Sequence, residues 1–279
     1  MKKTLLFIAI ALCFVACSKI EGPYLIQSQQ EAVDVVFPEI NPNTVYRKIL
    51  FDEYTGHRCS NCPTGHTILN NMLNQYGDTL VAVCIHAGSQ ARLMESEGLT
   101  YDFTTTTGDQ LFSDFGEPNN PGAIINRIKN ILYFENNWRN GVQNADRSLF
   151  AAIQIINQFD DAQQKLKINT KTTLLKDYEQ TVSLSLLLVE DNIIKPQMFP
   201  DQQVNENYTH NHVLRAGING NYGEHISSGG LVSKDSSYLY GYSIDFNGTD
   251  WVPENCSVIA ILLDESSKEV LQVEKTKVK

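Results

Sequence analysis

The chain has 279 residues, 42% of them hydrophobic and 19% charged, and 32 acidic residues against 22 basic ones give a formal net charge of −10. This is the composition of a globular protein long enough for two ordinary domains. We expect no nucleic-acid partner, because binding to phosphates needs a basic surface that this sequence lacks.

The N-terminus has the pattern of a signal peptide. Lys2 and Lys3 precede an unbroken apolar run over residues 5–15. That run is too short for a permanent transmembrane helix, which needs roughly 20 apolar residues. We therefore expect residues 1–16 to be removed after export.

The segment 14–17, Phe-Val-Ala-Cys, resembles the lipobox of bacterial lipoproteins. The resemblance implies that Cys17 is acylated and becomes the mature N-terminus, with residues 17–40 as a lipidated tether. Each buried acyl methylene contributes roughly 0.8 kcal/mol, so the chains on one cysteine hold a protein on a bilayer. We expect the lipid bilayer to be a partner through Cys17. An ordinary signal peptide with an incidental cysteine stays open as the alternative.

A strand, a cysteine pair and a helix come next. The strand covers residues 48–54 and is apolar before its acidic end. Apolar residues then recur at helical spacing from Pro63, which the first turn of a helix tolerates, to Gly77, which ends it. Cys59 and Cys62 therefore lie at the start of a helix.

The following segments alternate strands and helices. Residues 79–86 are apolar on both faces until their last position, which predicts a strand buried on both sides, as in a parallel sheet covered by helices. The patterns after it predict a helix over 106–115, a β-hairpin over 122–127 and 131–134, and a helix over 136–150. This order predicts an α/β, thioredoxin-like domain over residues 41–150.

Beyond residue 150 the chain consists of short β-type segments separated by polar turns. The predicted strands are 151–157, 166–174, 182–190, 212–218, 238–246 and 257–264. Such repetition predicts an all-β, immunoglobulin-like sandwich over residues 151–279. We expect two separable domains.

Six cysteines are present, but Cys13 leaves with the signal peptide and Cys17 is expected to carry lipid. The four others are too few for a disulfide scaffold. They comprise one close pair and two singles, Cys84 and Cys256, which we expect to be buried on strands.

The close pair has the spacing of a thiol–disulfide site. A helix N-terminus stabilises a thiolate, so Cys59 is the expected attacking sulfur and Cys62 the resolving one. His57 and Arg58 are expected to add positive charge beside Cys59. His86 ends a strand expected to lie parallel to the one before the cysteines, where it could donate a proton; a histidine satisfied by backbone is the open alternative.

Two motifs carry a family resemblance: Glu-Tyr-Thr-Gly-His-Arg-Cys-Ser-Asn-Cys-Pro over 53–63 and Asn-Pro-Gly-Ala-Ile-Ile-Asn-Arg over 120–127. With them, the chain from about Lys48 to its end resembles the outer-membrane protein twenty-eight family of lipoproteins, thioredoxin-like N-terminally with a β-sandwich after it. The resemblance implies an outer-membrane location, with the periplasmic face or the cell surface left open. By the thioredoxin likeness, Pro121 would be the cis-proline beside the disulfide, and Glu53 the buried acid that takes the proton of Cys62.

Other interpretations of the polar residues stay open. The disulfide of Cys59 and Cys62 could be a structural staple, and a cluster with His57 and His66 could bind zinc or copper(I). We expect neither a metal nor a cofactor. The histidine pair at 210 and 212 is expected in a solvated loop, and Arg127 in a salt bridge at the hairpin.

Two functions follow from these patterns. The first is thiol–disulfide exchange on exported envelope proteins through Cys59, which would make the protein an oxidoreductase. The rival is a non-enzymatic binding or adhesion lipoprotein with a structural disulfide. The sequence leaves open the substrate, the redox direction, the role of the sandwich and the oligomeric state.

Overall fold

The computed structural model describes residues 29–133, 135–227 and 231–279. The predicted signal peptide and Cys17, the predicted site of lipidation, lie outside the described residues.

The segment that carries the cysteine pair is built on three adjacent strands. β2 (Ile49–Thr55) pairs in parallel with β3 (Leu80–His86) on one side and antiparallel with β4 (Gly122–Ile125) on the other. The parallel arrangement of the first two strands confirms the sequence-based prediction. Three α-helices belong to this segment: α1 (Cys62–Tyr76), α2 (Thr106–Asp114) and α3 (Glu135–Asn144).

Two predicted elements differ from the structure. α3 ends at Asn144, six residues before the predicted end, because the chain there turns towards the next strand. The second strand of the predicted hairpin is reduced to one bridge between Ala123 and Leu132, in which each backbone N–H donates to the carbonyl of the other residue at 2.9 and 2.8 Å.

The remainder of the chain is almost entirely β-structure. Six strands match the predicted segments: β5 (Ala151–Asp160), β6 (Lys165–Leu174), β7 (Val182–Glu190), β10 (Val213–Gly217), β12 (Ser237–Asp245) and β13 (Cys256–Asp264). Five strands were not predicted: β1 (Gln29–Glu31), β8 (Ile193–Met198), β9 (Val204–His210), β11 (Glu224–His225) and β14 (Val270–Lys277). Short 3-10 helices lie at Gly77–Thr79, Ser89–Ala91, Glu95–Glu97 and Pro253–Asn255.

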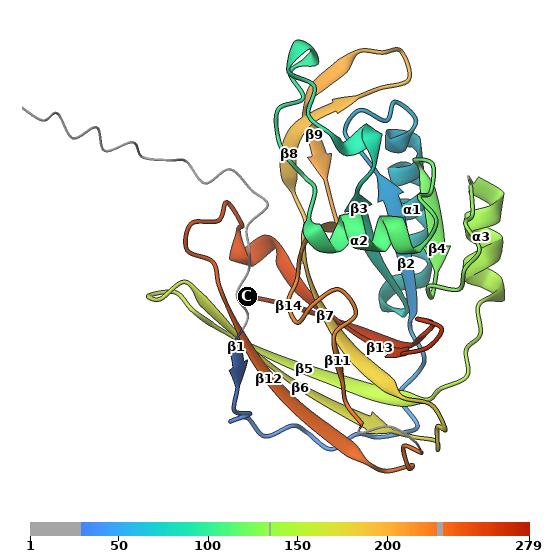
Figure 1. The fold of residues 1–279 in the computed structure, drawn as a ribbon, viewed down its shortest axis with the longest axis vertical. Coiled ribbons are helices and arrows are strands. Elements are labelled where there is room, and N and C mark those ends of the chain that lie inside the picture. The colour runs from blue at the N-terminus through green and yellow to red at the C-terminus, as the bar shows by residue number, and fades with distance from the viewer. Residues whose placement is uncertain (1–28, 134, 228–230) are drawn as a thin grey trace, which may run out of the picture.

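The strands form two large sheets and a separate hairpin (Figure 1). The larger sheet has the order β14-β13-β7-β10-β3-β2-β4, with β11 beside β7, and the smaller one β1-β12-β6-β5. β10 pairs in parallel with β3, with Val213 opposite Cys84. One sheet therefore contains strands from both sides of residue 150, and the domain boundary placed there stays a prediction.

Buried side chains cover both faces of the larger sheet. Alternate residues of β7 face opposite ways: Leu186 packs against the smaller sheet, and Leu187 lies in the layer that also contains Leu111 of α2. α1 and α3 cover the other face of β2 and β3, where Phe51 meets Trp138 edge to face at 5.2 Å. The fold is thus mostly β-structure with few helices, and its core continues across the middle of the chain.

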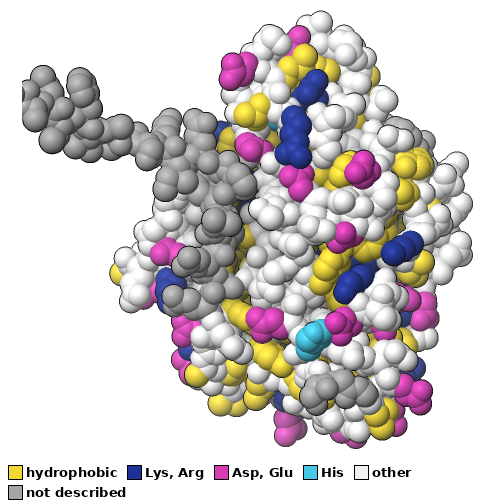
Figure 2. Space-filling model, viewed as in Figure 1, with side chains coloured by type: hydrophobic (Ala, Val, Ile, Leu, Met, Phe, Trp, Pro, Cys, Tyr) yellow, Lys and Arg dark blue, Asp and Glu magenta, His cyan; other side chains and the backbone are white. Residues whose placement is uncertain are grey.

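The outer surface shows no concentration of one charge on the face in Figure 2, where acidic and basic side chains are interspersed and hydrophobic ones form several separate groups. Among the described residues, no helix is long and apolar enough to span a membrane.

Candidate functional site

The loop between β2 and α1 is held close to a neighbouring loop. A Cβ on Gly56 would lie 2.4 Å from the backbone oxygen of Gln90, so only glycine fits at this position. The backbone N–H of Arg58 donates to that same oxygen at 3.0 Å, and the Arg58 guanidinium donates to the Ser89 carbonyl at 3.2 Å. These contacts fix the path of the chain just before the cysteine pair.

Cys59 and Cys62 form a disulfide with a Cα–Cα distance of 5.4 Å. Cys59 precedes α1 and lines an open cavity of about 360 Å³, whereas Cys62 is the first residue of α1 and is fully buried. The exposed fraction of Cys59 is only 3%. A reagent that enters the cavity therefore meets the sulfur of Cys59 and not that of Cys62.

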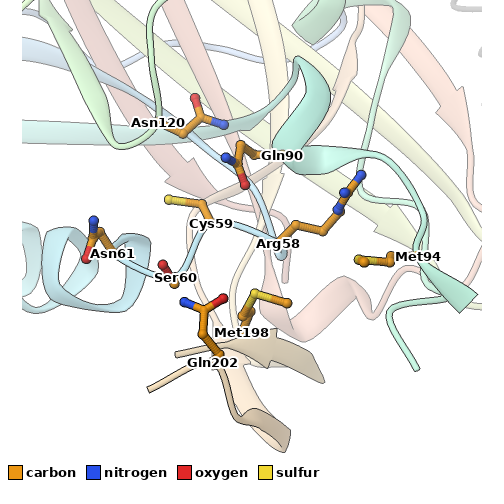
Figure 3. Close-up of a pocket in the computed structure, with 9 residues that line it drawn as sticks. All are labelled: Arg58, Cys59, Ser60, Asn61, Gln90, Met94, Asn120, Met198 and Gln202. Atoms are coloured by element: carbon orange, nitrogen blue, oxygen red, sulfur yellow. The ribbon is translucent and has the colours of Figure 1, made fainter. Parts of the chain in front are cut away.

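Polar side chains dominate the wall of this cavity. Figure 3 shows the Cys59 sulfur between Gln90 and Asn120 on one side and Met198 and Gln202 on the other. The other lining residues are Arg58, Ser60, Asn61 and Met94. A second cavity of about 590 Å³ shares Gln90 and Asn120 with the first, so the two form adjoining hollows.

Glu53 lies beneath the first turn of α1 and is fully buried. A Cβ on Gly65, one turn after Cys62, would lie 3.1 Å from Glu53 Oε1. The Cys84 thiol donates to the other carboxyl oxygen at 3.3 Å. Burial raises the pKa of Glu53 to about 8, so the carboxyl group carries a proton at neutral pH.

Pro121 lies against the same helical turn. The Asn120–Pro121 peptide bond is cis, and the Cβ of Pro121 would be 3.1 Å from a Cβ on Gly65. Asn120, which precedes it, donates from its side chain to the Ala87 carbonyl at 3.3 Å and faces both cavities. The structure therefore brings Glu53 and Pro121 to the helix turn that carries Cys62.

The charge expected from His57 is not found. His57 is buried, its Nε2 bonds to the Arg92 carbonyl at 3.0 Å, and burial lowers its pKa. A neutral imidazole contributes no positive charge to a thiolate. Arg58 is the cation beside Cys59.

His86 packs away from the cavity. Its ring stacks on Phe103 at 4.4 Å, and neither ring nitrogen has a hydrogen-bond partner among the described residues. His210 also contacts Phe103, at 4.5 Å, so its expected place in a solvated loop is wrong: it is buried at the end of β9. His212 is half-buried beside Asp191, with an Nδ1–Oδ1 distance of 2.9 Å. Burial lowers the pKa of His86 and brings that of His210 to about 3, so both rings are neutral.

Other polar residues of the sequence-based prediction have structural partners. His66 shares hydrogen bonds with Thr55 at 3.0 Å and with Tyr208 at 2.7 Å, and Arg127 forms a fully buried salt bridge with Asp52 at 2.9 Å. The salt bridge predicted for Arg127 is confirmed. No group of three or more histidine, cysteine, aspartate or glutamate side chains within the described ranges is arranged to hold a metal ion.

The β8–β9 hairpin belongs to the site although no sequence pattern placed it there. It lies over the loop before α1 (Figure 1), and its residues Met198 and Gln202 line the cavity. Tyr208 of β9 bonds to His66. The hairpin sequence is weakly periodic, and the loop that it contacts lies more than a hundred residues earlier in the chain. The role of the hairpin in the site is therefore visible only in the structure.

Comparisons with known proteins now add to this geometry. The family model described as "Outer membrane protein Omp28" matches residues 108–279, more than half of the chain. Among solved structures, HBP35 of Porphyromonas gingivalis has a TM-score of 0.64 at 13% identity and covers 84% of this chain and 76% of its own, a likeness of fold alone. A domain of the outer membrane lipoprotein Omp28 from Porphyromonas gingivalis is 26% identical over 47% of this chain and 89% of its own, with a TM-score of 0.33. No curated protein matches the sequence. The chain belongs to the Omp28 family of outer membrane proteins.

Proposed function

We propose that this outer membrane protein carries a thioredoxin-like domain whose Cys59–Cys62 pair exchanges disulfides with envelope polypeptides. One observation supports the proposal above all: Cys59 faces an open cavity, whereas Cys62 is fully buried in the first turn of α1. A structural staple needs no such difference, whereas an exchange site needs one sulfur that substrates can reach.

The arrangement around the pair also supports a thioredoxin-like domain. The parallel strands β2 and β3, the antiparallel β4, and helices on both faces of these strands follow the order expected for that fold. Pro121 and Glu53 lie at the first turn of α1. The rest of the chain, in which two sheets pack face to face, is the proposed β-sandwich.

The proposed exchange starts from the disulfide form. A substrate thiolate attacks the Cys59 sulfur, a mixed disulfide forms, and Cys62 leaves as a thiolate that takes the proton of Glu53. The second thiolate of the substrate then attacks the substrate sulfur that is bonded to Cys59. A disulfide forms within the substrate, and Cys59 leaves as a thiolate. Two electrons pass from the substrate dithiol to the cysteine pair, and the reverse reaction uses Glu53 as the proton acceptor. A carboxyl group with a pKa of about 8 is well matched to a thiol in this transfer.

Thiol trapping of the reduced protein tests the proposal. After dithiothreitol treatment under native conditions, we expect iodoacetamide to alkylate Cys59 much faster than Cys62, because only Cys59 lines the cavity. Cys62→Ser should accumulate mixed disulfides with envelope polypeptides, and Cys59→Ser serves as the matched control that should not. If dithiothreitol does not reduce the Cys59–Cys62 disulfide in the native protein, the disulfide has a structural role only. A binding function of the lipoprotein would then become the leading proposal.

A further inference from the structure

The β8–β9 hairpin makes direct hydrogen bonds to the backbone of the cysteine loop. Gln197 is fully buried, and its Nε2 lies 3.0 Å from the Cys59 carbonyl oxygen and 3.4 Å from that of Gly56. The next residue, Met198, donates its backbone N–H to the His57 carbonyl at 2.8 Å. Three carbonyl groups of the loop are thus engaged by two consecutive residues of β8.

The buried amide of Gln197 has an energetic cost. Its Oε1 is buried without a hydrogen-bond partner among the described residues, and an unsatisfied buried acceptor destabilises the folded state. An apolar side chain of similar volume would fill the space without that cost. The amide is therefore better explained by the carbonyl groups that it orients than by stability.

The Cys59 carbonyl is the point at which orientation matters. It also accepts the N–H of Cys62 at 3.1 Å, in the turn that leads from the cavity into α1. Holding this carbonyl fixes the peptide plane that follows Cys59, and with it the direction of the side chain relative to the cavity and the helix N-terminus. A thiolate at Cys59 is stabilised by that N-terminus only while this direction is kept.

We propose that Gln197 is a positioning residue for Cys59, so that the β-rich part of the chain sets the reactivity of a thiol in the other part. This inference rests on the proposed exchange function. It assigns to the hairpin a role beyond forming one wall of the cavity.

The test is the pH profile of Cys59 alkylation in the reduced, full-length protein. Gln197→Met keeps the length of the side chain and removes both N–H donors. We expect the apparent pKa of Cys59 to rise by about 0.5–1 unit, which lowers the alkylation rate at pH 7 by about 3- to 10-fold. The matched control is Gln203→Met, because Gln203 is exposed in the turn of the same hairpin. Its profile should equal that of the wild type.

A second variant separates loss of the positioning bond from misfolding of the first variant. Gln197→Asn keeps an amide that is one methylene too short to reach the Cys59 carbonyl, and we expect the same shift. A folded Gln197→Met or Gln197→Asn protein with the wild-type profile would overturn the positioning role. So would failure of both variants to fold, because Gln197 would then act through stability. If wild-type Cys59 is itself unreactive after reduction, the exchange function fails, whatever Gln197 does.

Discussion

Glu53 shows how a single buried residue makes stability depend on pH. Its folded pKa of about 8 lies above the value of 4.5 for an exposed glutamate, because burial disfavours the charged form. The folded protein therefore keeps a proton that the unfolded chain releases at lower pH. The contribution of this group to stability is complete below about pH 4.5 and is lost as the pH rises through about 8.

We predict that Glu53→Gln removes this dependence. Relative to the variant, the wild type should lose about 3–4 kcal/mol of unfolding free energy between pH 5 and pH 8. Urea unfolding of both proteins at the two pH values measures the difference. Cys59 alkylation should be almost unchanged in the variant, whereas turnover in an insulin assay should fall. Parallel stability curves for the two proteins would contradict a protonated Glu53.

The contacts of the β8–β9 hairpin also make stability depend on pH, but here stability falls as the pH is lowered. The hairpin packs on α/β residues through neutral imidazoles: burial lowers the pKa of His66 to about 4 and that of His210 to about 3. The unfolded chain binds protons at these histidines near pH 6.5, and the folded protein does not. Stability from these groups is therefore complete above about pH 6.5 and is lost as the pH falls.

We predict that acidification from pH 7 to pH 4.5 destabilises the protein through these histidines. Because Glu53 acts in the opposite direction over part of this range, the measurement belongs in the Glu53→Gln background. There, denaturant unfolding should show a steady loss of stability as the pH falls, and His210→Phe should reduce the loss. A flat profile in that background would show that the buried imidazoles are not kept neutral by the fold.

The elements also show what the sequence could and could not predict. Strands such as β7 and β13 have continuous apolar runs and were found, and so was α1, because its apolar spacing and its Pro63 and Gly77 are local signals. β8 is short and interrupted by Pro196, and β9 is mostly polar, so neither strand shows an alternation of apolar and polar residues. The two strands pair with each other, and they also bond to residues distant in the sequence, in the cysteine loop and in α1.

For the candidate site, too, the residues in short sequence motifs were predictable, and the properties that depend on burial or strand register were not. The cysteine pair, Glu53 and the proline before β4 lie in short motifs, and the structure brings them together. The neutrality of His57 was not predictable, because it results from burial of the ring, which lowers its pKa despite the opposing effect of the hydrogen bond to the Arg92 carbonyl. The bond from Cys84 to Glu53 required the exact register of two strands.

At the scale of the whole molecule, the larger sheet joins the two predicted domains. We predict that a fragment of residues 41–150 forms an α/β domain by circular dichroism but melts at least about 10 °C below the chain 41–279. In the fragment β3 loses its partner β10, and the core layer loses Leu187 and Val189. A random-coil spectrum would show that the boundary is wrong. Equal melting temperatures would show that the shared sheet adds no stability.

The proposed anchoring through Cys17 also concerns the whole molecule. We predict that Cys17→Ala abolishes labelling by a fatty-acid analogue and leaves the protein unprocessed or soluble, because Cys17 is the residue placed for acylation. Metabolic labelling and membrane fractionation measure this. Cys256→Ala is a suitable control, since Cys256 is buried in β13. Labelling that persists in the Cys17 variant would rule out the lipobox.

The position of β1 determines how far from the membrane the Cys59 cavity would lie in an anchored protein. Gln29 is 12 residues after Cys17, and 12 extended residues span at most about 43 Å. β1 pairs with β12 on the smaller sheet, at the opposite end of the molecule from the β8–β9 hairpin (Figure 1). If Cys17 is acylated, this tether would hold β1 within about 43 Å of the bilayer, with the cavity beside the β8–β9 hairpin at the other end of the molecule. Polypeptides in the aqueous compartment could then approach Cys59 freely, whereas those embedded in the same membrane would be kept out of its reach.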